Sequence, residues 1–176
     1  MIMPRGQQLL LPASPLFIFT SLIAALFVNM VANISLVGSA AWMPDFLALV
    51  LVFWCVHQPR WVGIGIAFFL GVVMDVHEAS LLGQHALTFT ALGFLAVMMH
   101  RRLLWFSVSS QAMQVLPIFA AAHILDLSVR MMSGGLFPGW DIFAAPIIEA
   151  FLWPLVSVIL LAPQRRAPDP DAHRPL

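Results

Sequence analysis

Long runs of apolar residues restrict this chain more than any other feature. The stretches 15–37, 111–132 and 141–161 are predominantly apolar, and about 20 such residues suffice for a helix that crosses a bilayer. Of the 176 residues, 61% are hydrophobic and only 9% are charged, which leaves too little polar surface to cover a soluble core. The sequence therefore predicts an all-α integral membrane protein.

Three shorter apolar runs, at 42–57, 62–77 and 85–100, lie between the first and second long stretches. Glycine, proline and polar clusters separate all six runs. A β-barrel is disfavoured, because barrel strands alternate apolar and polar residues whereas these runs are continuous. We expect a six-transmembrane-helix bundle over 15–161, a cytoplasmic tail at 1–14, and a disordered cytoplasmic tail at 162–176, which is rich in proline and charge.

The positions of the arginines predict the orientation. All eight basic residues are arginines, and a six-span chain places all but Arg130 on one face: Arg5, Arg60, Arg101, Arg102, Arg165, Arg166 and Arg174. Short cytoplasmic connections retain positive charge, so both termini are expected in the cytoplasm of a bacterial-type inner membrane. The formal net charge is zero, which gives no basic field for nucleic acid.

Three acidic residues of the predicted spans are functional candidates, because charge inside a membrane is costly. Asp75 lies near the outer end of the third run, and a cap or interfacial role stays open beside a functional one. Asp126 shares one helix face with His123 and Arg130, which favours a self-satisfied polar stripe facing the bundle over a metal site. Glu149 is nearest the middle of a span and most needs a partner, and a hydrogen-bonded acid that holds helices together is the simpler reading.

Smaller features are explained by helix packing. Asn29 and Asn33 fit hydrogen bonds between helices, and Gly71 allows close backbone approach. Cys55, the only cysteine, cannot form an intrachain disulfide. No nucleophile and base, zinc-protease motif or phosphate-binding loop is recognisable in the sequence. We therefore expect no catalytic residue, cofactor or metal.

Residues 44–87 closely resemble the core of the MreD family of rod shape-determining membrane proteins. The resemblance rests on Pro44, Trp54, the turn at Pro59 and Arg60, the G-x-x-x-D pattern of Gly71 and Asp75, and the L-G-x-x-A-L pattern that contains Gly83. A second patch, Leu152, Trp153 and Pro154, is also similar. The stripe of His123, Asp126 and Arg130 does not match the family pattern.

The resemblance implies a non-enzymatic role in the cell-elongation complex that maintains rod shape and lateral peptidoglycan synthesis. It implies MreC as partner, with MreB, RodA and its transpeptidase reached directly or through MreC, and it leaves room for a homodimer within the lipid bilayer. It also implies a helix arrangement similar to the S components of energy-coupling vitamin transporters. That similarity supports a second hypothesis, a small-molecule carrier whose pocket is lined by Asn29, Asp126 or Glu149. An intramembrane enzyme has the least support.

Overall fold

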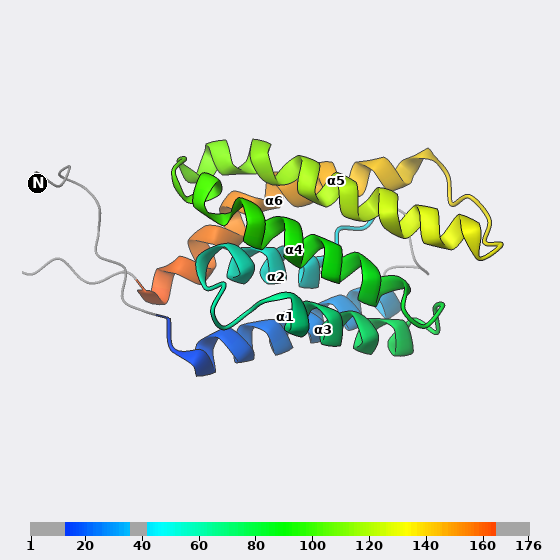
Figure 1. Cartoon of the computed structure of the whole chain (residues 1–176), viewed down its shortest axis with the longest axis horizontal. Coiled ribbons are helices and arrows are strands. Elements are labelled where there is room, and N and C mark those ends of the chain that lie inside the picture. The colour runs from blue at the N-terminus through cyan, green and yellow to red at the C-terminus, as the bar shows by residue number, and fades with distance from the viewer. Residues whose placement is uncertain (1–12, 36–41, 165–176) are drawn as a thin grey trace, which may run out of the picture.

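The computed structural model describes residues 13–35 and 42–164, and the elements in this part of the chain are all helical (Figure 1). Six α-helices and two short 3-10 helices follow one another: α1 Pro15–Ser35, α2 Phe46–His57, α3 Ile64–His77, α4 Gln84–Leu104, α5 Val108–Met132, η1 Trp140–Phe143, α6 Ala144–Leu161 and η2 Ala162–Gln164. This order confirms the predicted all-α membrane fold. By length and composition, α1, α4, α5 and the η1–α6–η2 stretch could each cross a membrane, whereas α2 and α3 are shorter apolar helices.

Several helix ends differ from the predicted ones. Helix α4 continues to Leu104 and includes Arg101 and Arg102 in its last turn, because backbone hydrogen bonding extends past the point where hydropathy falls. Helix α5 begins at Val108, where residue 111 was expected, and the sixth segment opens with the 3-10 turn η1. The first residues of the predicted C-terminal tail form η2, while 1–12 and 165–176 lie outside the described residues.

The connections divide the bundle into two ends, which lie at opposite sides of Figure 1. At one end, called the cavity end because a polar cavity lies there, helices α1, α3 and α5 end and α2, α4 and α6 begin. The other end is called the arginine end. Its connection 58–63 contains Arg60, and its connection 105–107 directly follows the last turn of α4, which contains Arg101 and Arg102. Four tryptophans near helix ends are exposed, a placement typical of anchors at the membrane–water interface: Trp42, Trp61, Trp105 and Trp140.

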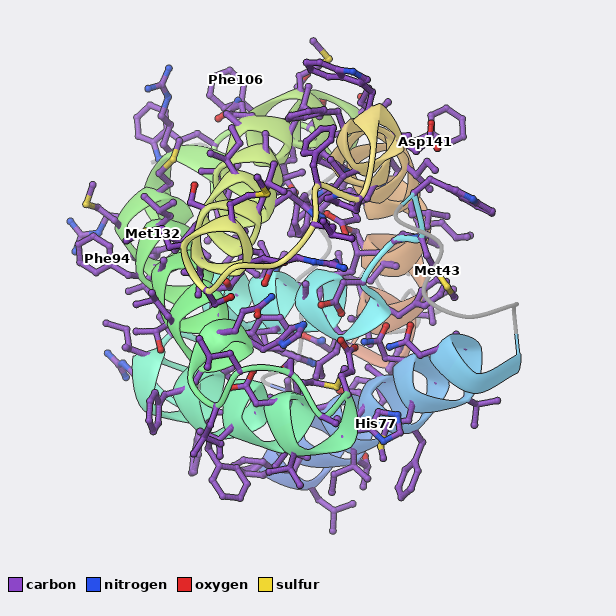
Figure 2. All side chains as sticks on the ribbon, turned by 90° about the vertical axis from the view of Figure 1, so that its right-hand side faces the viewer. Met43, His77, Phe94, Phe106, Met132 and Asp141 are labelled. Carbon is purple, nitrogen blue, oxygen red and sulfur yellow. The ribbon has the colours of Figure 1, made fainter. Side chains whose placement is uncertain are left out.

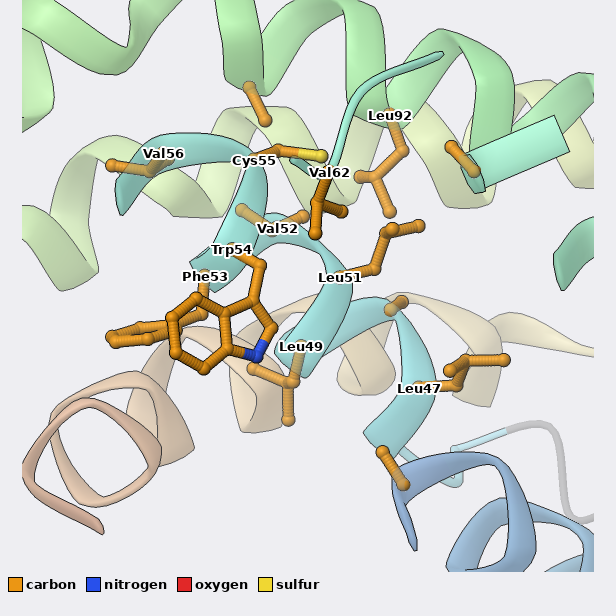
Figure 3. Packing of buried hydrophobic residues seen from close by; sticks show 14 of the residues in the cluster. Leu47, Leu49, Leu51, Val52, Phe53, Trp54, Cys55, Val56, Val62 and Leu92 are labelled. Carbon is orange, nitrogen blue, oxygen red and sulfur yellow. The ribbon is translucent and has the colours of Figure 1, made fainter. Parts of the chain in front are cut away.

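Helix α2 lies at the centre of the bundle and contacts α1, α4 and α6. Every residue from Leu47 to Val56 except Val50 is buried, and Figure 3 shows their side chains pointing out from several sides of the helix. A helix that is apolar on all sides is typical of a core position. Its N-terminus is capped by Asp45, whose side chain accepts a hydrogen bond from the Ala48 amide at 2.9 Å.

Helices α3 and α4 form the closest pair, and glycine explains their contact. A Cβ added to Gly71 would lie 2.5 Å from the Ala86 Cα and the His85 carbonyl oxygen. Gly93 plays a similar part from the α4 side, where a Cβ would lie 3.0 Å from the Ala67 Cβ. Small residues at such positions let membrane helices approach closely, as predicted for Gly71. Gly65, in contrast, faces open space.

Candidate functional site

A polar cavity of about 570 Å³ occupies the cavity end of the bundle. Helix α2 has only 12 residues, and at about 1.5 Å per residue it spans much less than the ~30 Å hydrocarbon core. The space beyond its N-terminus is left open between the ends of α1 and α5 and the start of α6. Figure 2 looks onto this end, with nitrogen and oxygen atoms near the centre and mostly carbon around the outside.

Glu149 of α6 lies at the inner wall of the cavity and is 0% exposed. Its Oε1 accepts a hydrogen bond from the Asp45 amide at 2.9 Å and lies 2.9 Å from the His123 Nε2. Its Oε2 has no hydrogen-bond partner among the described residues. The predicted need of Glu149 for a partner is thus met at one oxygen only.

The two asparagines of α1 contribute to the same wall; Asn29 makes the expected bond between helices, whereas Asn33 bonds to the residue that follows α3. Asn29, which is 4% exposed, accepts a hydrogen bond from the Phe46 amide at 3.2 Å through its Oδ1. The Asn33 Nδ2 donates to Glu78 Oε1 at 2.7 Å. Both contacts tie the end of α1 to the segments around it.

The polar stripe of α5 faces the cavity, but its partners come from other helices. His123 meets Glu149 of α6, and Asp126 Oδ1 accepts a hydrogen bond from the Gln84 Nε2 of α4 at 3.0 Å. Arg130 is exposed and also lines the cavity. The stripe therefore faces the bundle as predicted, while its hydrogen bonds are made between helices and not along its own face.

Asp75 is buried outside the cavity wall and organises the turn from α3 to α4. Its Oδ2 accepts hydrogen bonds from the amides of Gly83 at 2.8 Å and Ala86 at 3.3 Å. Its Oδ1 accepts from the His85 amide at 2.7 Å and the Ser80 hydroxyl at 3.0 Å. A carboxylate of one helix thus caps the N-terminus of the next, where unpaired amides and the helix dipole favour negative charge. Gly83, the residue before α4, has a φ of 104°. This left-handed backbone conformation is one that glycine adopts without strain.

The remaining predicted residues are dispersed. Pro44 is buried and lines the cavity. The Trp54 Nε1 donates to the Ser21 hydroxyl at 2.8 Å, and the Trp153 Nε1 donates to Gln111 Oε1 at 3.2 Å. Pro154 lies inside α6. The two tryptophans thus join helices within the core, and the four residues do not share one site.

Sequence reasoning missed Asp45 and His85. Asp45 had a visible signal, an acidic residue directly before an apolar run, which is typical of a helix N-cap. The two ring nitrogens of His85 lie 3.0 Å from Asp75 Oδ1 and 3.4 Å from Glu78 Oε2. His85 also lines the cavity, so it links the α3–α4 turn to the cavity wall.

Comparisons with known proteins agree with the resemblance seen in the sequence. Residues 13–162 match a family model described as rod shape-determining protein MreD. The chain is 27% identical over 130 residues to the rod shape-determining protein MreD of Haemophilus influenzae, a match that covers 74% of this chain and 80% of that protein. No solved structure matches the chain significantly. The similarity to S components of vitamin transporters therefore stays a prediction.

Proposed function

The chain belongs to the MreD family of rod shape-determining membrane proteins, and from this premise we propose that it is a non-enzymatic component of the bacterial cell-elongation complex. In this role it binds MreC within the inner membrane and supports lateral peptidoglycan synthesis. The observation that carries the proposal is the extent of the match, since residues 13–162 include all six helices. The part of the chain that defines the family is thus the bundle itself.

The outer surface of the bundle supports a role through contacts inside the membrane. Large apolar side chains are exposed on most helices, among them Phe27 of α1, Phe69 of α3, Met98 of α4 and Phe151 of α6. In a bilayer such side chains contact lipid or another helix, and helix association there depends on packing. MreB, RodA and its transpeptidase would then be reached directly or through MreC.

The test is recovery of MreC with the tagged chain from solubilised membranes of rod-shaped cells that carry it as their only MreD. We expect rod shape to be maintained and MreC to be enriched over a control purification with an unrelated multi-pass protein bearing the same tag. MreC at the control level, with round cells, would contradict the proposal.

A photoreactive amino acid at Phe27, Phe69, Met98 or Phe151 then identifies the contacting face. Phe53, which is buried in α2, provides the matched control. Crosslinks to MreC should arise from one face and not from position 53. Crosslinks to a second copy of the chain would reveal a homodimer.

A second function, a small-molecule carrier, is favoured by the cavity alone. Asn29, Asp126 and Glu149 all line it, and its volume lies within the usual range of ligand sites, about 300–1,000 Å³. A vitamin-sized molecule that survives purification without MreC would favour this function over the first.

A further inference from the structure

The cavity concentrates the acidic residues of the chain. Five of its eight acidic residues line the wall, namely Asp45, Glu78, Asp126, Asp141 and Glu149. Arg130 is the arginine that lines it, beside His85 and His123. The formal charge of the wall is therefore −4 with both histidines neutral and −2 with both protonated. A negative, partly enclosed surface of this kind attracts cations.

Glu149 supplies an independent reason to expect a ligand. Its side chain is fully buried, and its Oε2 has no hydrogen-bond partner among the described residues. A buried polar atom that is left unpaired loses its hydrogen bonds to water without replacement, which is unfavourable. Protonation does not remove the mismatch, because an Oε2–H group would then be a donor without an acceptor.

We propose that the cavity binds a primary ammonium group, with the buried Oε2 of Glu149 as its principal acceptor. The site goes beyond the proposed role in rod shape and does not depend on MreC binding. The ammonium group belongs either to a small molecule or to a lysine side chain of a partner protein.

The geometry selects an ammonium group over other cations. A guanidinium binds carboxylates through two parallel hydrogen bonds, but Oε1 of Glu149 is already occupied by Asp45 and His123. An ammonium group is a compact charge with three donors, so one can reach Oε2 while the others reach neighbouring acceptors. Among the described residues, no group of three or more histidine, cysteine, aspartate or glutamate side chains could hold a metal ion.

The first experiment measures binding of putrescine to the full chain in lipid nanodiscs, followed as a saturable rise in thermal midpoint at constant ionic strength. Tetramethylammonium, which has the same type of charge but no N–H donors, is the ligand control. We expect a response to putrescine alone. Equal responses to both cations, or no saturable response to putrescine, would overturn the proposal in favour of general ionic effects or a water-filled cavity.

Variants locate the site. Glu149→Gln should raise the half-saturating putrescine concentration at least tenfold, and Asp141→Asn, at an exposed position of the wall, should raise it by a smaller factor. Asp171→Asn, which removes a carboxylate from the C-terminal tail, should leave it unchanged. If Glu149→Gln does not fold, the Asp141→Asn variant decides between the outcomes. Unchanged binding in every folded cavity variant would overturn the assignment.

Carbodiimide treatment of native membranes distinguishes the two sources, because it joins a carboxylate directly to a primary amine in contact with it. Mass spectrometry of the peptide containing Glu149 should find either a small amine or a lysine-containing peptide attached. A small amine identifies a free ligand, and a lysine peptide identifies a partner. The absence of any amine adduct on Glu149 and Asp45 contradicts the proposal, whatever the outcome of the MreC experiment.

Discussion

Asp75 shows how one carboxylate can fix the relation between two helices. Both of its oxygens accept backbone amide hydrogen bonds, Oδ1 from His85 and Oδ2 from Gly83 and Ala86. The simplest role available to a polar residue at a helix end, capping its own helix, is therefore not the one observed. The carboxylate instead satisfies the first amides of α4, which have no partner within that helix.

Asp75→Asn should destabilise the protein and impair rod shape at matched membrane levels. Either orientation of the amide places an NH2 group against backbone N–H donors, and each unsatisfied buried donor costs about 1–3 kcal/mol. The thermal midpoint in detergent, cell shape and MreC recovery measure the effect. Ser80→Ala, which removes one donor but keeps both carboxylate oxygens, should have a smaller effect. A normal midpoint with rod-shaped cells would leave Asp75 without the role assigned here.

At this scale the sequence identifies acidic residues inside the membrane more readily than it identifies their hydrogen-bond partners. The cost of charge in a membrane is sufficient to single out Asp75, Asp126 and Glu149. The contacts of Glu149 with His123 and Asp45, in contrast, join positions 26 and 104 residues apart. Such pairs depend on how the helices pack and have no local signal.

At the level of helices, the short α2 determines the architecture. It is apolar on all sides and almost completely buried, so its length is limited by the core and not by the bilayer. The breakers in the sequence correctly separated it from α1 and α3. Its central position could not be predicted, because continuous hydropathy does not distinguish a helix surrounded by protein from one surrounded by lipid.

The contact between α3 and α4 predicts different effects for two glycine substitutions on α3. Gly71→Ala places a Cβ 2.5 Å from the α4 backbone, and such overpacking typically costs about 1–3 kcal/mol. It should also disturb the amides that Asp75 caps, because the clash is with His85 and Ala86.

Gly65→Ala is the matched control on the same helix, since nothing lies within 4 Å of its added Cβ. It should leave stability unchanged or raise it by up to ~1 kcal/mol through helix propensity. Thermal midpoints of the two variants in the same detergent make the comparison. A shift in the same direction for both would contradict the close contact.

For the molecule as a whole, the two ends of the bundle differ in chemistry. Arg60, Arg101 and Arg102 are at one end, and the acid-lined cavity with Arg130 is at the other. Because short cytoplasmic connections retain positive charge, the cavity is expected to open to the periplasm. A ligand or partner that enters it would then come from that side of the membrane.

Labelling of single cysteines with a membrane-impermeant maleimide tests this orientation in spheroplasts. The native Cys55 is buried in α2, so the unmodified chain should stay unlabelled and provide the background. Leu136→Cys at the cavity end and Trp105→Cys at the arginine end form a matched pair, since the native side chains are 86% and 91% exposed. We expect Leu136→Cys to react in intact spheroplasts and Trp105→Cys only after permeabilisation, because the reagent cannot cross the bilayer. The reverse pattern would show that the cavity opens to the cytoplasm, and the ligand of Glu149 would then enter from that side.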